Sequence, residues 1–233
     1  MRLVLFDVDG TLLSSSGAGR RALERALREV YGTAGPIDDY DFHGGTDLQI
    51  VHDLLGLAGL LPEAVAAGES RLFARYVEWL DAEVGDGGGV SLHPGVRALV
   101  ERLGEIDECL VGLLTGNIEA GARIKLRPTG LWPRFRLGAY GSDHADRNRL
   151  PEVAARRAEV LVGRVFRGPD VVVIGDTPRD IECARAFGAS AVAVATGRLG
   201  VADLRAHVPD HVFADLADTE RVLAAILDGH GER

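Results

Sequence analysis

The chain alternates short apolar runs with amphipathic segments, and this alternation restricts the fold more than any other feature of the sequence. Beyond residue 89, apolar runs predict strands over residues 110–114, 137–140, 171–174, 191–195 and 211–213. Helical spacing of apolar residues predicts helices over residues 94–103, 118–126, 151–165, 179–187 and 219–227. Strands that alternate with helices form a parallel sheet with helices on both faces. The sequence therefore predicts an α/β fold built on a doubly wound parallel sheet.

One more apolar run opens the chain and ends abruptly in acidic residues. It leads into Asp7 and Asp9, which are one residue apart, and then into Gly10 and Thr11. Side chains two positions apart lie on the same side of an extended chain, so the two carboxylates would repel each other. A hard cation such as Mg²⁺, which prefers oxygen ligands, would remove that repulsion. Because a polar turn after a strand has a similar composition, this stretch alone leaves a metal site and a plain turn both open.

Three helices in succession interrupt the alternation after the first strand. They are predicted over residues 17–31, after an N-cap residue at Thr46, and over residues 62–84. No apolar run of strand type separates them, and a glycine-rich connection over residues 85–89 follows. We therefore predict a Rossmann-like core formed by residues 1–14 and 89–233, with residues 15–88 as a small all-α insertion.

The second and fourth predicted strands also end in polar residues. The second leads into Thr115, Gly116 and Asn117, which place a hydroxyl and free backbone amides before a helix. The fourth leads into two further carboxylates, Asp176 and Asp180. The first group would serve equally well to cap a helix, and the second as turn and helix-start residues. In open α/β folds the carboxyl ends of the strands form the edge where ligands bind, so we expect chemistry there.

Composition restricts the partners of the chain. A formal net charge of -9 and a pI near 5.3 disfavour a general affinity for nucleic acid or for an anionic membrane surface. Cys109 and Cys183 are the only cysteines, so no disulfide framework or zinc-ligand spacing is present, and we expect a reducing, cytoplasmic location. No apolar run has the pattern of a signal peptide or reaches the ~20 residues of a membrane span.

Taken together and in this order, the motifs resemble those of the haloacid dehalogenase-like hydrolase superfamily. They are Asp7-Val8-Asp9-Gly10-Thr11, Thr115, and Gly175-Asp176-Thr177-Pro178-Arg179-Asp180. The resemblance covers the whole chain, since the helical insertion lies where that superfamily places its small C1 cap. It implies an enzyme in which Asp7 is a nucleophile that becomes an aspartyl-phosphate. Asp9 would be the general acid that protonates the leaving oxygen, and then the base that activates water.

The same resemblance implies a Mg²⁺ cofactor and a phosphoryl-binding site. The cation would be held by the Asp7 carboxylate, the Asp9 main-chain carbonyl and Asp176, with Asp180 in support. The phosphoryl oxygens would be bound by Thr115 and by the following amides of Gly116 and Asn117. Such an arrangement is physically coherent, because phosphoryl transfer depends mainly on positioning and on neutralising charge.

The third motif of the superfamily is a lysine, and here the sequence departs from the pattern. Lys125 is the only lysine of the chain, and it comes too early, on the helix predicted after Thr115. The best candidate for the equivalent position is Arg147, just before a predicted helix, with Arg149 second. A planar guanidinium cannot replace an ammonium without moving atoms, so neutralisation of the phosphoryl charge would differ. A solvated charged loop is the alternative interpretation.

Further residues discriminate among the activities of the superfamily. A halide leaving group needs no proton, whereas the alkoxide of a phosphate ester does, so Asp9 with Gly10 and Thr11 indicates the phosphatase branch. The insertion contains no lysine for Schiff-base chemistry. Residues 43–47 are similar to the cap loop that faces the core in phosphoglycolate phosphatase-like members, although a turn with Thr46 as N-cap residue would have the same sequence.

We therefore predict a Mg²⁺-dependent phosphatase that hydrolyses a small phosphorylated metabolite, phosphoglycolate-like as the first choice, through an aspartyl-phosphate. Two alternatives are a phosphosugar mutase of the same superfamily and a catalytically weak metabolite-binding or interaction module, the latter suggested by the missing lysine. We expect no nucleic-acid or membrane partner, and either a monomer or a homodimer.

Overall fold

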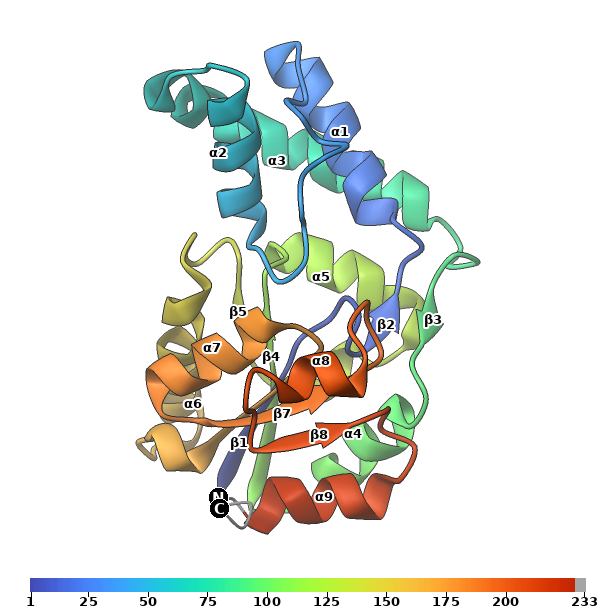
Figure 1. The fold of residues 1–233 in the computed structure, drawn as a ribbon, viewed down its shortest axis with the longest axis vertical. Helices are drawn as coiled ribbons and strands as arrows, with labels where there is room; N and C mark the ends of the chain where they lie inside the picture. The colour runs from blue at the N-terminus through green and yellow to red at the C-terminus, as the bar shows by residue number, and fades with distance from the viewer. Residues whose placement is uncertain (229–233) are drawn as a thin grey trace.

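A six-stranded sheet forms the centre of the computed structural model, which describes residues 1–228. The strands are β1 (Arg2–Phe6), β4 (Cys109–Thr115), β5 (Gly138–Tyr140), β6 (Val171–Gly175), β7 (Ser190–Val194) and β8 (His211–Phe213). Their order across the sheet is β5-β4-β1-β6-β7-β8, and each neighbouring pair is parallel. The predicted parallel sheet is confirmed, with β1 between β4 and β6 (Figure 1).

Helices cover both faces of this sheet. One hydrophobic core is shared with α4 (Val96–Gly104), α5 (Glu119–Leu126) and α9 (Thr219–Asp228), and the other with α6 (Leu150–Val162), α7 (Pro178–Phe187) and α8 (Val201–Arg205). Alternate residues of β1 enter different cores: Val4 and Phe6 pack in the first, and Leu3 and Leu5 in the second. A strand buried on both faces needs apolar residues at every position, which explains the continuous apolar run that opens the chain.

Three helices form a separate layer above the carboxyl ends of the strands (Figure 1). They are α1 (Ala18–Tyr31), α2 (Asp47–Leu57) and α3 (Pro62–Val84), and they share a hydrophobic cluster that includes Leu27, Leu54 and Leu72. A short antiparallel pair, β2 (Leu13–Ser14) and β3 (Ser91–Leu92), joins the two chain crossings at the base of this layer. We call the three-helix layer the cap. Residues 15–88, which we predicted as the insertion, lie between these two strands. That residues 15–88 form a separate domain remains a prediction.

The predicted helices and strands lie within a few residues of the observed ones. The largest difference is α6, predicted to residue 165, which ends at Val162 because Gly163 adopts a φ of 70° and its amide bonds to the Glu159 carbonyl. The two-residue strands β2 and β3 and the five-residue helix α8 were not predicted. Two residues of a strand and little more than one turn of a helix are too few to show a period. Single turns of 3-10 helix also occur: η1 (Arg127–Thr129), η2 (Trp132–Arg134), η3 (Arg147–Arg149) and η4 (Gly168–Asp170).

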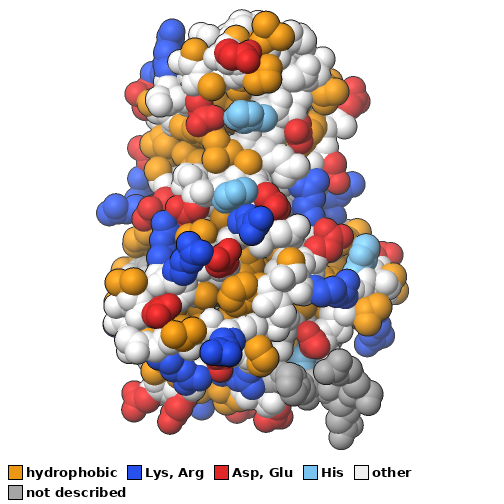
Figure 2. Space-filling view, turned by 90° about the vertical axis from the view of Figure 1, so that its left-hand side faces the viewer, with side chains coloured by type: hydrophobic (Ala, Val, Ile, Leu, Met, Phe, Trp, Pro, Cys, Tyr) orange, Lys and Arg blue, Asp and Glu red, His pale blue; other side chains and the backbone are white. Residues whose placement is uncertain are grey.

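Acidic and basic side chains are interspersed over the surface of both the cap and the core (Figure 2). Within the cap, Arg75 pairs with Glu29 at 2.7 Å and Arg21 with Glu83 at 2.8 Å, each bond joining α3 to α1. Exposed pairs of this kind contribute at most about 1 kcal/mol each, so the cap is held together mainly by its apolar cluster. Within residues 1–228, no helix is both long enough and apolar enough to cross a membrane.

Candidate active site

Three buried carboxylates meet where β1 and β6 end. Asp7 follows β1, Asp176 follows β6, and Asp180 lies in the first turn of α7. The two strands are neighbours with Phe6 opposite Ile174, so their carboxyl ends lie side by side. One oxygen from each of the three carboxylates lies within 4.8 Å of the other two. This carboxylate cluster could hold a metal ion.

Burial and mutual repulsion disfavour the ionised form of the cluster. Burial raises the pKa of Asp7 to about 6, against the opposing charge of Arg147. Burial, followed by the charges of Asp180 and Asp7, raises the pKa of Asp176 to about 8. A divalent cation would reverse both effects, and carboxylate oxygens are the ligands that hard cations prefer. The donor set therefore fits a cation of the Mg²⁺ type.

The loop after β1 is shaped around Asp176. An ideal Cβ on Gly10 would lie 2.4 Å from Asp176 Oδ2, and one on Gly197 would lie 1.8 Å from the same atom, so neither position accepts a side chain. Thr11 Oγ1 donates a hydrogen bond to Asp176 Oδ1 at 3.0 Å, and Thr196 Oγ1 donates to the Gly10 carbonyl at 2.6 Å. The glycine of the first motif thus permits a close approach, and its threonine orients a carboxylate from another strand.

Arg147 lies beside the carboxylate cluster and is only 5% exposed. Its Nη2 lies 3.2 Å from Asp7 Oδ1 and donates to Asp180 Oδ1 at 2.5 Å. The second oxygen of Asp180 accepts from the amide and the hydroxyl of Thr177, at 3.0 and 2.6 Å. Arg149, in contrast, is exposed. The geometry therefore favours Arg147 over Arg149, and it suits Asp180 to a supporting position, since both of its oxygens are engaged.

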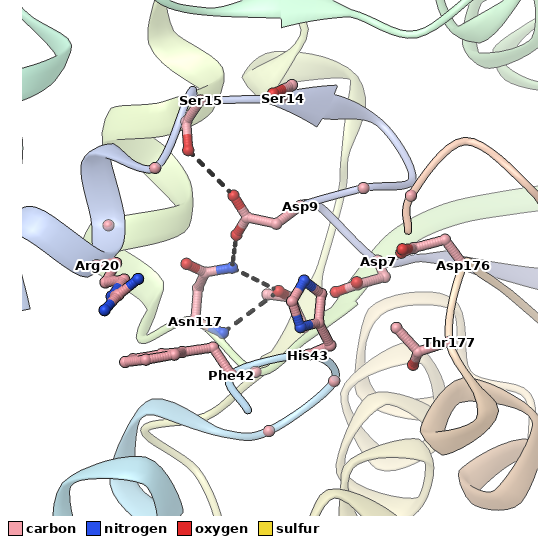
Figure 3. A pocket seen from close by; sticks show the side chains of 18 of the residues that line it. Asp7, Asp9, Ser14, Ser15, Arg20, Phe42, His43, Asn117, Asp176 and Thr177 are labelled. Atoms are coloured by element: carbon pink, nitrogen blue, oxygen red, sulfur yellow. Dashed lines mark hydrogen bonds between the residues drawn. The ribbon is translucent and has the colours of Figure 1, made fainter. Parts of the chain in front are cut away.

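Asp9 turns away from the carboxylate cluster (Figure 3). Its Oδ2 accepts from Lys125 Nζ at 2.6 Å and from Asn117 Nδ2 at 2.8 Å, and its Oδ1 accepts from Ser15 Oγ at 3.3 Å. Burial opposes ionisation of Asp9, but the Lys125 ammonium and these hydrogen bonds outweigh it and lower the pKa of the carboxyl. Asp9 is thus held as a carboxylate at the side of the cluster, in contact with the core helix α5.

Lys125 is the site residue that sequence reasoning missed. It is 5% exposed, and besides Asp9 it donates to Asn117 Oδ1 at 2.6 Å. In the sequence, Lys125 was a candidate only for the lysine of the third motif, and it comes too early in the chain for that position. A signal was nevertheless present, because Lys125 shares the buried stripe of α5 with Gly121 and Ala122. A lysine within such a stripe requires a buried acceptor, and Asp9 is the nearby acid of the first motif.

Thr115 and Asn117 lie between Asp9 and the end of β4. Thr115 is fully buried, and its Oγ1 accepts from the Asn117 amide at 3.3 Å and from Asn117 Nδ2 at 2.8 Å. The Thr115 hydroxyl proton therefore remains free to donate. The Asn117 side chain lines the cavity and bridges Thr115, Asp9 and Lys125, so it positions these three groups. Phosphoryl binding by the amides of Gly116 and Asn117 stays a prediction.

Comparisons with known proteins find similar proteins along most of this chain. A family model described as HAD-hydrolase-like matches residues 151–219. A phosphoglycolate phosphatase from Synechococcus elongatus is 29% identical over 229 residues, which cover 97% of this chain and 99% of that protein. A phosphoglycolate phosphatase from Rhodobacter capsulatus is 29% identical over 187 residues, covering 79% of this chain and 80% of that protein. These matches confirm the predicted resemblance to the haloacid dehalogenase-like hydrolase superfamily.

Solved structures share the fold of this chain along most of its length. A hydrolase from Pseudomonas syringae matches with a TM-score of 0.72 at 20% identity, covering 96% of this chain and 98% of the other. A β-phosphoglucomutase from Clostridium difficile matches with a TM-score of 0.71 at 15% identity, covering 97% of each chain. Both matches extend over the cap as well as the core, and at these identities they show the fold alone.

A cavity of about 650 Å³ lies between the cap and the carboxyl edge of the sheet. The carboxylate cluster contributes to one side, and Arg20 and Phe42 of the cap contribute to another (Figure 3). The Arg20 guanidinium lies 5.8 Å from the centre of the Phe42 ring and bonds to Asp38 at 2.6 Å. His43, at the same cavity, is 44% exposed and pairs with Asp41. The cap therefore provides a cationic and aromatic wall opposite the cluster.

Saturating Mg²⁺ is expected to raise the melting temperature of this chain by about 5–10 °C. A ligand at 100 times its dissociation constant adds about 2.7 kcal/mol, and each kcal/mol shifts the melting temperature by about 2–4 °C in a chain of this size. Thermal melts in Mg²⁺ and in EDTA measure the shift. Asp176→Asn should abolish it, whereas Asp107→Asn, which alters an exposed carboxylate, should retain it. An equal shift in the Asp176 variant would mean that the ion binds elsewhere.

A fourth buried carboxylate, Asp47, attaches the cap to the core. Its amide donates to the Gly116 carbonyl at 2.7 Å, and its Oδ2 accepts from the Ile118 amide at 2.8 Å. Burial raises the pKa of Asp47 to about 6, with the Lys125 charge and the Ile118 amide opposing the rise. At neutral pH, Asp47 therefore carries a buried charge that weakens the folded state.

This raised pKa gives the stability a pH dependence with a definite sign. Because the folded pKa lies above the usual value of 3.8, the stabilisation from a protonated Asp47 is complete below pH 3.8 and is lost as pH rises through 6. Asp47→Asn keeps an acceptor for Ile118 without the charge. Its stability advantage over the wild type is expected to be about 1 kcal/mol larger at pH 8 than at pH 5.

Urea unfolding at the two pH values measures this difference. Asp39→Asn, which changes an exposed carboxylate of the cap, is the matched control and should show no comparable dependence. An Asp47→Asn advantage of the same size at both pH values would contradict the raised pKa.

Proposed function

We propose that this chain is a Mg²⁺-dependent phosphatase that hydrolyses a small phosphorylated metabolite through an aspartyl-phosphate on Asp7. One observation carries the proposal: Asp7 lies in the carboxylate cluster, beside the buried Arg147, at a cavity that Asp9 also lines. A nucleophile, a cation site and an acid–base group thus share one pocket. Phosphoryl transfer requires little more from a protein than this positioning and charge neutralisation.

The first half of the reaction uses Asp7. Its carboxylate attacks the phosphorus atom, an O–P bond forms, and the bond from phosphorus to the leaving oxygen breaks. Arg147, held by Asp180, keeps a positive charge beside Asp7 throughout. Asp7, the Asp9 carbonyl and Asp176 would hold Mg²⁺, which would supply positive charge to neutralise the phosphoryl oxygens. The Thr115 hydroxyl would donate to a phosphoryl oxygen.

Asp9 moves the protons in both halves. It gives a proton to the leaving oxygen, and the resulting carboxylate then accepts a proton from the water that attacks the aspartyl-phosphate. Inorganic phosphate leaves and the Asp7 carboxylate is restored. The hydrogen bonds from Lys125, Asn117 and Ser15 suit the carboxylate form needed in the second half. The negative charge of a bound phosphate ester would favour the protonated form needed in the first half.

For the substrate we propose a phosphoglycolate-like ester first. The support is the similarity to proteins named phosphoglycolate phosphatase, one of them over 97% of this chain. Arg20 at the cavity is a cation on the cap side, where the leaving group of a small ester would lie. We also propose a cytoplasmic location, because Cys109 and Cys183 are both free thiols.

Release of inorganic phosphate tests the proposal. The panel consists of p-nitrophenyl phosphate, phosphoglycolate, glucose 1-phosphate and glucose 6-phosphate, each with Mg²⁺ and with EDTA. We expect metal-dependent release, with the highest kcat/KM for the small carboxylated ester. Interconversion of the glucose phosphates without phosphate release would favour a mutase instead. Ligand-dependent thermal shifts without any turnover would favour a binding module.

A further inference from the structure

The cap loop is defined as residues 43–47, and its His43 Nδ1 lies 3.2 Å from Arg198 Nη1 of the core. Residues 44–47 make four further hydrogen bonds to the core. From donor to acceptor these are Thr46 Oγ1 to Ala145 O (2.6 Å), Asp47 N to Gly116 O (2.7 Å), Ile118 N to Asp47 Oδ2 (2.8 Å), and Arg147 Nη1 to Gly44 O (3.3 Å). An ideal Cβ on Gly116 would lie 1.8 Å from the Gly45 carbonyl oxygen, so the two backbones are in close contact. The structure therefore shows the cap loop docked on the core.

One of these four contacts also reaches the nucleophile. Arg147 donates through Nη1 to the Gly44 carbonyl of the cap loop, while its Nη2 donates to Asp180 and lies 3.2 Å from Asp7 Oδ1. Its Nε is buried and has no hydrogen-bond partner among the described residues. The guanidinium thus makes two sets of contacts: Nη1 bonds to the cap loop, and Nη2 contacts the carboxylates.

A lysine at this position would not hold the two contacts in a fixed geometry relative to each other. An ammonium is a single point charge at the end of a flexible chain, whereas the nitrogens of a guanidinium are fixed in one plane. A displacement of the Gly44 carbonyl that tilts this plane also moves Nη2 relative to Asp7. Gly44 itself is confined, because it adopts a φ of +69° and an ideal Cβ there would lie 2.7 Å from Thr177 Oγ1.

We propose that Arg147 is a positioning residue that couples docking of the cap loop to the placement of the Asp7 carboxylate. When the loop is docked, the Gly44 carbonyl holds the guanidinium in the plane in which Nη2 meets Asp7. When the loop leaves, that restraint is lost and the contact with Asp7 loosens. The coupling itself is a property of the fold, and only its effect on turnover rests on the proposed phosphatase function.

Hydrogen–deuterium exchange tests the coupling without any substrate. The Asp47 and Ile118 amides are bonded across the interface, so their exchange reports docking of the cap loop. Arg147→Lys keeps the charge beside Asp7 and Asp180 but loses the arm that reaches Gly44. We expect these two amides to exchange about tenfold faster in this variant, since one hydrogen bond from a charged donor is lost.

Arg149→Lys is the matched control, because it makes the same chemical change at an exposed position two residues away. It should leave both exchange rates at wild-type values. Unchanged exchange in Arg147→Lys would overturn the proposal. Equal acceleration in the two variants would overturn it as well, since the effect would then not depend on the arm that reaches the cap.

A second variant approaches the coupling from the cap side and does not depend on whether Arg147→Lys folds. Gly44→Ala displaces the Gly44 carbonyl, and we expect kcat to fall about tenfold with a smaller change in KM. Gly59→Ala also places a side chain at a positive φ, of +84°, but in open space, and should leave kcat unchanged. If the two residues are coupled, Gly44→Ala will cost little further activity in the Arg147→Lys background.

The two experiments separate the two proposals. If the wild type turns over no phosphate ester, the proposed function fails, while the exchange rates still decide the coupling. Additive losses from Gly44→Ala and Arg147→Lys in an active enzyme would refute the coupling and leave the phosphatase standing.

Discussion

Asp7→Asn is expected to lower kcat for phosphate release by at least ~10³-fold. The amide has the size of the carboxylate but lacks the anionic oxygen that forms the bond to phosphorus. Burial raises the pKa of Asp7 to about 6, so the wild-type carboxylate is itself unfavourable in the folded protein. The variant should therefore lose activity without losing thermal stability.

Parallel measurements of phosphate release and of the melting temperature check this expectation. Asp107→Asn, the same change at an exposed position, should retain both quantities. Activity that survives Asp7→Asn at the wild-type rate would remove Asp7 from the nucleophile role. A parallel loss of melting temperature would show that the effect is structural.

Lys125→Met is expected to lower kcat/KM by about 10²-fold for esters with poor leaving groups, the lower end of what acid–base catalysis contributes. The change removes the donor that lies 2.6 Å from both Asp9 Oδ2 and Asn117 Oδ1. Asp9 then loses the charge that holds its carboxylate in place. Esters of p-nitrophenol, whose leaving group needs no proton, should be affected much less.

Two comparisons separate this effect from general damage to α5. Arg123→Met changes an exposed cation on the same helix and should leave kcat/KM unchanged. In an Asp9→Asn background, Lys125→Met should add little further loss, because its action passes through Asp9. Independent, additive losses would mean that Lys125 acts elsewhere in the site.

The fold class could be predicted from the sequence, and so could the strand ends at which the candidate site residues lie. The apolar run ending in Asp7 and the run ending in Asp176 were predicted as buried strands, and parallel pairing of β1 with β6 then placed both acids at one edge. The three helices of the insertion were predicted at nearly their observed bounds. These results follow from periodicity and from strand ends, which are local properties that a chain displays without its tertiary contacts.

The groups that the side chains contact could not be predicted from the sequence and are visible only in the tertiary structure. The sequence offers Arg147 as the first candidate and Arg149 as the second, and the turn η3 buries the first against Asp7 and leaves the second exposed. Lys125 gave no motif signal, since its partner Asp9 is far away along the chain. The direction of a side chain and the meeting of distant segments depend on packing, and in this single turn two arginines that are two residues apart differ in burial.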